Sequence, residues 1–497
     1  MILADIAEYV TDKISSNDVS LNNYVTTDSL LQNKRGRECA QNLPPMPCAL
    51  IHFQPKDILI ANIRPYLKKI WFADIEGGCS SDVLVFRAKE GHFPNFLYAT
   101  LMQDAFYDYV MKGVKGSKMP RGDKEQIMRY KMPTFSSDEE QNIGKIVVDI
   151  EKKLQLSRAI NDNLEAMAKQ LYDYWFVQFD FPNEEGKPYK SSGGAMVWNE
   201  ELHMNIPYSW NTCLLNDYIG SNNTGDWGFD EPAEKRNMKV GCIRGADIVK
   251  LNDLPTRYIK DSNTSKLLSV WDIVIEVSGG SPTQATGRSA FVTPGVLKRN
   301  GGNLTCSNFC HAFTMKNYKA SAYFFFMWRM FYDNNNMFNY EGKTSGIKNF
   351  MTGTFLANKW LDVPTALLDL FFERIKVIYE QIDNNIEEIN ALTKQRDELL
   401  PLLMNGQASV NYHLSKWSIG FLCLDMHIEY DKDIVQKEAD KQDFNPLVRK
   451  PYSFTFFKHT SYPFFMFLLQ FKLFVTMSHK LPTDFHNKVH TNVVQRF

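Results

Sequence analysis

The chain has 497 residues, of which 44% are hydrophobic and 13% aromatic, so it can build two or more domains with apolar cores, which excludes a disordered chain. Its formal net charge of −1 excludes nucleic-acid binding through the bulk field, so such binding would need local basic surfaces. The eight cysteines are scattered and no N-terminal stretch has the charged-then-apolar form of a signal peptide, so we expect a soluble, cytoplasmic protein.

A first mixed α/β module with short strands is predicted over residues 1–135. The runs 57–60 and 82–86 are rich in β-forming residues and have the length of strands. Gly77-Gly78 is expected to form a turn before the second of these strands. A helix is predicted over residues 98–111 of the module.

A basic loop of small residues follows that predicted helix. Residues 112–118 have the sequence KGVKGSK and are followed at once by Met119-Pro120-Arg121. Such a loop can bring backbone N–H groups and ammonium groups close to phosphate oxygens. A solvated surface loop is the other interpretation of the same residues.

A long helix is predicted over residues 136–180, because apolar positions there recur in alternating steps of three and four. Ser136 or Ser137 can cap its start, with Glu139 or Glu140 reaching back in a capping box. The resulting stripe is the seam of a coiled coil and consists of Val147, Ile150, Leu154, Ser157, Asn161, Leu164, Ala168, Leu171 and Trp175.

The stripe returns once, 228 residues later, which is the difference between positions 147 and 375. A linker predicted to be flexible, residues 181–197, leads into a second module at residues 198–365, and a second helix is predicted over residues 366–408. The second stripe consists of Ile375, Ile378, Ile382, Asn385, Ile389, Leu392, Arg396, Leu399 and Leu403. The chain is therefore predicted to be an internal duplication of a module followed by a helix.

The second module repeats landmarks of the first in the same order. Residues 57–60 have a counterpart at 272–275, an offset of 215, and residues 79–82 have one at 306–308, an offset of 227. The growing offset indicates that the second copy has gained loop residues. We expect the two modules to share a frame and to differ in their loops.

Two motifs suggest chemistry, but both are incomplete. Gly342-Lys343-Thr344 resembles the end of a phosphate-binding P-loop, yet the glycine which that motif requires is Met337. Cys306 and Cys310-His311 are ligand types for zinc, but no second pair at ligand spacing exists, which favours buried thiols. No catalytic residue and no metal site is therefore predicted.

Four motifs, taken in order, carry a resemblance to a known family over about residues 1–408. They are DILIANIRP at 57–65, EEQ at 139–141, QLYDYWF at 170–176 with DFP at 180–182, and LLPLLMNG at 399–406. In these motifs the chain resembles the specificity subunit of a type I restriction-modification enzyme.

The resemblance implies both a fold and a function. The fold is α+β (mixed), with two globular α/β target recognition domains separated and joined by two long helices that form an antiparallel coiled coil. Each domain would read one half of a bipartite, asymmetric site in double-stranded DNA. Two modification (methyltransferase) subunits would dock on the helices, and restriction (translocase/nuclease) subunits would complete the complex. The chain itself would be non-catalytic and bind no cofactor, because S-adenosylmethionine, ATP and Mg would be bound by partner subunits.

Candidate DNA-binding residues follow from chemistry, since the family has no universal set of base-reading residues. Arginine and lysine suit guanine, asparagine and glutamine suit adenine, and lysine, serine and threonine hold phosphates. In the first module the candidates are Arg64, Lys115, Ser117, Lys118 and Arg121. In the second module they are Arg288, Lys343, Thr344, Ser345 and Lys348.

Residues 409–497 follow the point at which such chains usually stop, and an atypical, poorly ordered extension is predicted there. Its apolar run at 462–476 is interrupted by Pro463, Gln470 and Lys472, and falls short of the roughly 20 apolar residues that a membrane span needs. Two other functional classes stay open: a coiled-coil adaptor whose modules bind protein, and a self-sufficient nuclease or methyltransferase, which the missing motifs disfavour.

Overall fold

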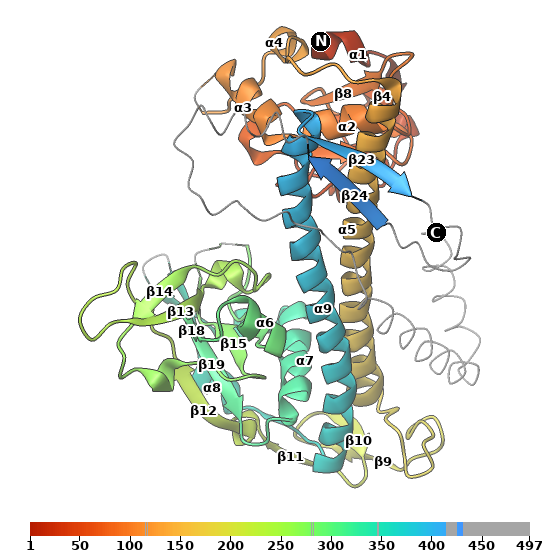
Figure 1. Ribbon diagram of the computed structural model, residues 1–497. Coiled ribbons are helices and arrows are strands. Elements are labelled where there is room, and N and C mark those ends of the chain that lie inside the picture. Colours follow the sequence, from red (N-terminus) through yellow and green to blue (C-terminus); the bar gives the residue numbers. More distant parts are fainter. Residues whose placement is uncertain are drawn as a thin grey trace. The chain divides into compact units, whose positions relative to one another are not determined.

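The computed structural model describes residues 1–413 and 425–430, apart from residues 115, 117, 280, 282, 345 and 346 (Figure 1). The chain forms two compact units: unit 1 combines Met1–Ile150 with the chain from Arg396 onward, and unit 2 is Glu151–Gln395. The long helices α5 (Ser137–Tyr172) and α9 (Thr365–Met404) each contribute to both units. Each unit contains helices and strands, which confirms the predicted mixed α+β class.

Unit 1 contains two four-stranded sheets, with the strand orders β1-β8-β5-β6 and β2-β4-β7-β3. Its strands are β1 (Ala7–Tyr9), β2 (Lys13–Ser15), β3 (Tyr24–Val25), β4 (Ala49–Phe53), β5 (Ile58–Ala61), β6 (Ile70–Phe72), β7 (Gly77–Cys79), β8 (Val83–Ala88), β23 (Ala408–His413) and β24 (Asp425–Tyr430). Its shorter helices are α1 (Leu3–Ile6), η1 (Ser16–Asp18), η2 (Pro65–Leu67), α2 (Pro94–Met102), α3 (Asp104–Lys112) and α4 (Lys124–Met128).

Strand β5 is buried on both faces, which explains why its sequence is apolar throughout rather than alternating. Ile58 and Ile60 belong to the core that includes α2 and α3, whereas Leu59 and Ala61 belong to the core that includes Phe53. Successive strand residues point to opposite faces of a sheet, so a strand between two cores needs an apolar residue at every position. The predicted strand at residues 57–60 is therefore a central element of unit 1.

The helix predicted at residues 98–111 is in fact two helices, α2 and α3. Gln103 separates them with an extended backbone (φ −64°, ψ 142°), and its Nε2 donates to the carbonyl oxygen of Thr100 at 3.1 Å. Asp104 then begins α3 and forms ion pairs with Lys34 and Lys68 at 2.7 and 2.9 Å. These tertiary contacts override a local pattern that continues through the break.

The turn predicted at Gly77-Gly78 is wrong, because both glycines lie within strand β7. Gly78 pairs with His52 of β4 and, on the other side, with Tyr24 of β3. A Cβ atom at Gly77 would lie 2.0 Å from the carbonyl oxygen of Asn23. Glycine is therefore needed here for a close approach of two backbones rather than for a turn.

Unit 2 has a main sheet of order β12-β19-β15-β17, two three-stranded sheets, β14-β13-β18 and β16-β21-β20, and the pairs β10-β9 and β11-β22. Its strands are β9 (Met196–Asn199), β10 (Met204–Pro207), β11 (Asn211–Leu214), β12 (Ile219–Thr224), β13 (Met238–Ile243), β14 (Thr256–Ile259), β15 (Ile273–Glu276), β16 (Ser278–Gly279), β17 (Ser289–Phe291), β18 (Leu304–Cys306), β19 (Cys310–Met315), β20 (Glu341–Thr344), β21 (Ile347–Phe350) and β22 (Lys359–Asp362). Its shorter helices are η3 (Asp173–Val177), η4 (Leu215–Tyr218), η5 (Gly245–Asp247), η6 (Thr264–Lys266), α6 (Pro294–Arg299), α7 (Ala320–Asp333), η7 (Asn336–Tyr340) and α8 (Thr352–Leu356).

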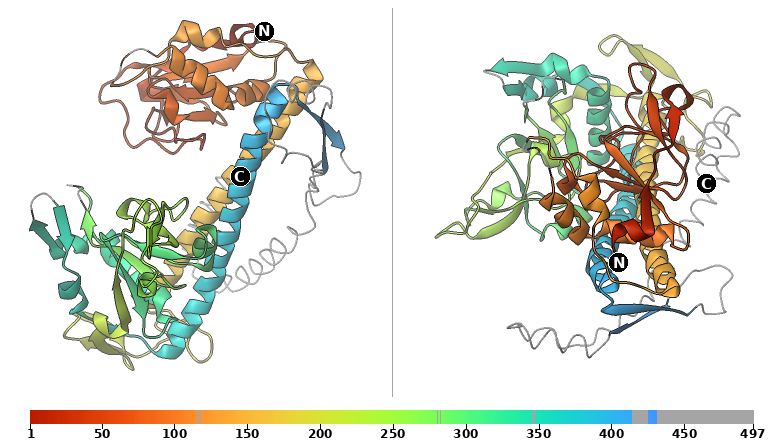
Figure 2. Two further views of the ribbon diagram at one scale, coloured as in Figure 1. Left: turned by 60° about the vertical axis from the view of Figure 1, so that its left-hand side comes forward. Right: turned by 90° about the horizontal axis from the view of Figure 1, so that it is seen from above.

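Helix α7 lies beside the main sheet of unit 2 (Figure 2), and its aromatic residues pack against that sheet. Phe325 stacks on Phe291 of β17 with ring centroids 5.0 Å apart, and Trp328 meets Phe313 of β19 at 5.8 Å. The indole nitrogen of the buried Trp328 donates to the carbonyl oxygen of Gly287 at 2.7 Å. This bond ties the loop before β17 to the helix that covers the sheet.

Helix α5 begins with the predicted capping box, formed by Ser136 and Glu139. Glu139 Oε2 accepts hydrogen bonds from the backbone nitrogen and the hydroxyl of Ser136, both at 2.7 Å, and the Ser136 hydroxyl accepts from the Glu139 backbone nitrogen at 3.4 Å. The bonds from Ser136 lower the pKa of Glu139 below its usual value, although partial burial opposes them. The box satisfies backbone donors that the first turn would leave unpaired.

We predict that Ser136→Ala lowers the free energy of unfolding by ~0.5–2 kcal/mol at neutral pH, the usual cost of losing such a cap. Because the folded pKa of Glu139 is depressed, the contribution of the box is present above the unfolded pKa and is lost as pH falls through the folded pKa. Urea unfolding at neutral pH and again below about pH 4 should therefore show a difference that shrinks on acidification. Ser137→Ala is the matched control, and an equal loss in both variants would contradict the assignment.

The two predicted stripes meet in antiparallel fashion within unit 2. Asn385 Nδ2 donates to Asn161 Oδ1 at 2.7 Å, and Ser157 Oγ donates to Glu388 Oε2 at 3.5 Å, so a later residue of α5 contacts an earlier residue of α9 (Figure 1). In unit 1, Val147 and Leu403 belong to one apolar core. The polar stripe positions Asn161 and Asn385 are thus paired with each other, and Ser157 has a partner in Glu388.

The observed helix bounds are Ser137–Tyr172, followed by the π-helical turn η3, and Thr365–Met404, where the sequence predicts 136–180 and 366–408. The segment predicted as a flexible linker, residues 181–197, is held by hydrogen bonds. Asp180 accepts from the backbone nitrogen and the hydroxyl of Ser191 at 2.7 and 2.6 Å. Strand β9 then begins at Met196.

The two units share hydrogen bonds at positions that the predicted duplication makes equivalent. The counterpart carboxylates Asp57 and Asp272 both accept from the backbone nitrogen three residues earlier, Gln54 at 2.8 Å and Ser269 at 2.7 Å. The bridge between Ile2 and Lys131 in unit 1 has its counterpart in the pairing of Leu214 with Lys359 in unit 2. The two carboxylates and their donors are each 215 residues apart in the chain, and the two members of the bridge are 212 and 228 residues from their counterparts. The repeated landmarks therefore occupy equivalent positions in the two units.

Most of the predicted C-terminal extension, including the apolar run at 462–476, lies outside the described residues. None of the helices in the described part of the chain has the length and apolar character required to cross a bilayer.

Candidate nucleic-acid interface

Several of the predicted DNA-binding residues of unit 1 meet where β5 ends. We call this place the first corner; it comprises residues 62–64, Asp82 and residues 120–122. The backbone nitrogen of Asn62 donates to the carbonyl oxygen of Asp82 at 2.8 Å, and that of Gly122 donates to the carbonyl oxygen of Asn62 at 3.2 Å. Between these bonds, Ile63 forms an antiparallel bridge with Arg121. The corner thus joins three segments that are far apart in sequence.

The same corner exists in unit 2 where β15 ends; this second corner comprises residues 277–279, Phe309 and residues 348–350. The backbone nitrogen of Val277 donates to the carbonyl oxygen of Phe309, and that of Phe350 donates to the carbonyl oxygen of Val277, both at 2.8 Å. Between them, Ser278 pairs with Asn349. The offsets are 215 for the strand end and 227 to 228 for the other two segments, so each bond of the first corner has an equivalent in the second.

The first corner presents cations on its surface. Arg64 is exposed and holds a left-handed backbone conformation (φ 52°), and its backbone nitrogen donates to the carbonyl oxygen of Pro120 at 2.8 Å. Lys118 is also exposed. The Arg121 side chain is 55% exposed and contacts Asp82, itself 38% exposed, at 3.1 Å. Three of the predicted cations of the first module therefore lie at or next to one corner.

A cluster of ion pairs around Asp104 anchors the loop that carries Arg64. Lys34 and Lys68 both bind Asp104 of α3, at 2.7 and 2.9 Å, and Lys34 is almost fully buried. Burial opposes ionisation of Asp104, but the two ammonium groups outweigh it and lower the pKa of this carboxyl. The backbone nitrogen of Lys34 also donates to the carbonyl oxygen of Lys68 at 2.8 Å. Helix η2 is therefore held at its end by the contacts of Lys68 and at its start by the bond from Arg64 to Pro120, which fixes the position of Arg64.

Two of the predicted cations of the second module, Arg288 and Lys348, are neutralised within unit 2. Arg288 forms two hydrogen bonds with Glu276, at 2.8 and 2.6 Å, and these bonds raise the pKa of Arg288 above its usual value. Lys348 forms an ion pair with Glu341 at 3.0 Å, and only 17% of its side chain is exposed. We therefore interpret Arg288 and Lys348 as residues that hold the loops of the second corner in shape.

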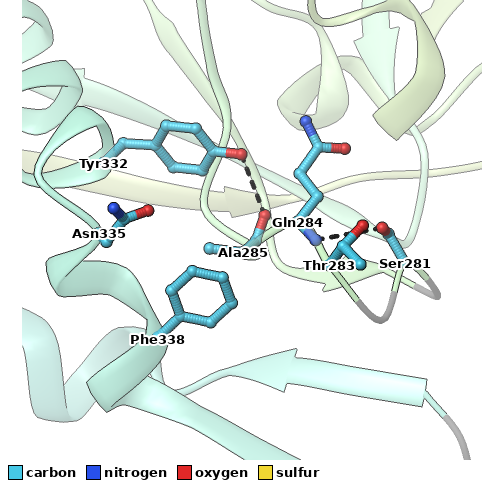
Figure 3. A pocket seen from close by; sticks show the side chains of 7 residues that line it. All are labelled: Ser281, Thr283, Gln284, Ala285, Tyr332, Asn335 and Phe338. Atoms are coloured by element: carbon cyan, nitrogen blue, oxygen red, sulfur yellow. Dashed lines mark hydrogen bonds between the residues drawn. The ribbon is translucent and has the colours of Figure 1, made fainter. Parts of the chain in front are cut away.

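Among the side chains that the structure describes, amides and aromatic rings rather than free cations lie beside the second corner. A pocket of about 340 Å³ lies between the segment before β17 and the end of α7 (Figure 3). It is lined by Ser281, Thr283, Gln284, Ala285, Tyr332, Asn335 and Phe338. Lys348 lies over the ring of Phe338, 5.1 Å from its centroid, so the pocket and the second corner are continuous. The residues that line the pocket therefore offer hydrogen-bonding groups and apolar rings but no charged side chain.

Several candidate residues cannot be placed. Lys115, Ser117 and Ser345 lie outside the described residues, and for Lys343 and Thr344 only the backbone, within β20, is described. Sequence reasoning missed Asp82, Phe309 and Asn349, which the corners bring to the surface. The repeat in the sequence could have identified Asn349, because it lies 228 residues after Arg121, the same offset that separates the two stripes.

The cysteines that suggested half of a zinc site lie in the core of unit 2. Cys306 and Cys310 are both fully buried, and burial raises the pKa of Cys310 to about 12. Both therefore remain thiols at neutral pH, as the buried-thiol interpretation predicts. Within the described residues, no group of histidine, cysteine, aspartate and glutamate side chains is arranged to hold a metal ion.

Comparison with characterised proteins finds two relatives. The chain is 25% identical over 334 residues to the type I restriction enzyme MjaIX specificity subunit of Methanocaldococcus jannaschii, which covers 65% of the chain and 71% of that relative. It is 23% identical over 185 residues to the type I restriction enzyme HindI specificity subunit of Haemophilus influenzae, covering 36% of the chain and 40% of that relative. No protein-family model matches the chain.

Among solved structures, the chain is similar to the S subunit of a type I restriction-modification system from M. genitalium. The TM-score is 0.46 at 13% sequence identity, and the match covers 81% of this chain and 95% of that one.

Proposed function

We infer that the chain is a specificity subunit of a type I restriction enzyme, the family that its motifs resemble and to which both characterised relatives belong. Such a subunit recognises DNA sequence and is not itself a catalyst. The adaptor interpretation, in which the modules bind protein, is not favoured by these relatives. The assignment is the premise for the proposals that follow.

The observation that carries the proposal for the site is the pair of equivalent corners with different side chains. A protein that reads two different half-sites needs one scaffold repeated and its surface chemistry varied. The backbone bonds of the corners are repeated, whereas Arg121 and Asp82 are replaced by Asn349 and Phe309. This is the pattern expected for two recognition modules that bind duplex DNA at unlike sequences.

The proposed complex supplies the chemistry that this chain lacks. Two modification subunits would dock on the duplicated helices α5 and α9, because duplicated sequence presents near-duplicate surfaces. Restriction subunits would join them, and S-adenosylmethionine, ATP and Mg would bind to those partners. In this assembly, which would work in the cytoplasm, the chain positions DNA and determines which site is modified.

We predict that the full chain binds a duplex carrying its target far more tightly at low salt than at high salt. Phosphate neutralisation by lysine and arginine releases counterions, so affinity should fall by on the order of 10³-fold between 50 and 200 mM salt if about six phosphates are contacted. Fluorescence anisotropy with a labelled duplex measures this. A salt-independent affinity, or capture of protein but not DNA, would favour the adaptor.

The target is expected to be asymmetric and interrupted, because the two corners differ in chemistry. The wild-type complex with its modification subunits should methylate one bipartite sequence, with unread bases between two unlike halves. Methylation mapping by sequencing of genomic DNA from cells that express the complex tests this. A continuous or palindromic site would refute the two-corner interpretation.

A further inference from the structure

We propose that Arg121 and Asn349 are equivalent specificity residues, and that the first corner reads a G·C pair whereas the second corner reads an A·T pair. The inference rests on the proposed function and deepens it, because it names the base pair that each corner selects.

The two residues occupy the same place in their units. Arg121 faces Ile63 and Asn349 faces Ser278 in equivalent antiparallel pairs, flanked by equivalent backbone bonds. The hydrogen bonding of a strand pair determines on which face of the pair a side chain lies. Because Arg121 and Asn349 have equivalent pairing, their side chains lie on equivalent faces of their units. Both residues are exposed.

The chemistry of the first corner suits a G·C pair. A guanidinium group binds the O6 and N7 atoms of guanine with two hydrogen bonds, and a carboxylate accepts from the N4 amino group of cytosine. Arg121 and Asp82 supply these two groups side by side, 3.1 Å apart. Their mutual ion pair is largely exposed and therefore weak, so DNA can replace it.

The chemistry of the second corner suits an A·T pair. A side-chain amide binds the N6 and N7 atoms of adenine, and apolar groups contact the methyl group of thymine. Asn349 supplies the amide, and Ser278 Oγ holds it by donating to its Oδ1 at 2.6 Å. Phe309, which stands where Asp82 stands in the first corner, is 54% exposed and supplies the apolar contact.

Selection from a library of randomised duplexes with the full chain tests the proposal. The wild-type chain should enrich a bipartite motif. Arg121→Ala should remove a G·C preference at one position of one half, and Asn349→Ala an A·T preference at one position of the other half, each with a loss of roughly 5- to 150-fold in discrimination. Arg121→Lys should also relax the G·C preference, since it keeps the charge but loses the two-pronged geometry.

Matched controls separate these effects from general ones. Arg129→Ala removes an exposed arginine of unit 1 that forms an ion pair with Glu125 on its own helical turn, and Asn205→Ala removes an exposed asparagine on β10 of unit 2. Both should leave the motif unchanged, and circular dichroism should show that all variants are folded. A wild-type chain that enriches no motif would overturn the proposed function. A wild-type motif that survives intact in Arg121→Ala and Asn349→Ala would overturn this inference alone.

Discussion

Replacing Asp383 by alanine is expected to destabilise unit 2 by ~3–5 kcal/mol, the cost of removing one partner from a buried ion pair. Asp383 lies on α9 and is only 7% exposed. Its carboxylate accepts from the hydroxyl of Thr293, the backbone nitrogen of Gly295 and the guanidinium of Arg299, all at 2.9 Å. Without it, the buried Arg299 charge and the first turn of α6 lose their partner, so α6 should separate from α9.

Urea unfolding followed by tryptophan fluorescence measures this loss. Glu387→Ala is the matched control, because Glu387 lies one turn further along α9 and pairs with the exposed Lys298 of the same α6. An exposed pair of this kind contributes ~0–1 kcal/mol. Similar losses in the two variants would show that the Asp383 contacts do not hold α6 on α9.

Neutralising the exposed cations at and next to the first corner is expected to weaken DNA binding far more than neutralising Lys348 of the second corner. The triple variant Arg64→Gln, Lys118→Gln, Arg121→Gln removes three exposed cations. If Arg64 and Lys118 each contact a phosphate while Arg121 contacts guanine, the slope of log affinity against log salt should fall by ~2. At low salt the affinity should drop on the order of 100-fold or more, since each such contact contributes to the same salt-dependent term.

Lys348→Gln is the contrast to the triple variant, because Lys348 is already paired with Glu341. Its removal should leave the salt slope unchanged, although it should lower the free energy of unfolding. Anisotropy titrations at four salt concentrations measure both slopes. A larger change of slope for Lys348→Gln than for the triple variant would mean that DNA approaches the second corner through its cations.

The sequence predicts those features that depend on local periodicity or on repetition. The stripes of α5 and α9 and the Ser136 cap follow from spacing within a single helix, and the offsets of 215 and 227 lead to the equivalent corners. Features that depend on distant partners were missed or misjudged. The break at Gln103 and the strand position of Gly77 are imposed by tertiary contacts.

The candidate cations show the same division. Arg64 and Lys118 are exposed, and their role in DNA binding stays a prediction. The sequence favours Arg288 as a DNA-binding residue because arginine suits guanine, whereas folding places it against Glu276 across adjoining strands. A charge count cannot distinguish a free arginine from a paired one, because pairing depends on which strands become neighbours.

The bonds that build the two corners join only main-chain N–H and C=O groups, so they survive any change of side chain at positions 82, 121, 309 and 349. Protein evolution usually couples a new binding preference to a loss of stability, because binding residues also support the fold. In the two corners, side-chain atoms would contact the DNA, whereas main-chain atoms form the hydrogen bonds that support the fold. New preferences can therefore arise by single substitutions, one half-site at a time, while the rest of the molecule stays as it was.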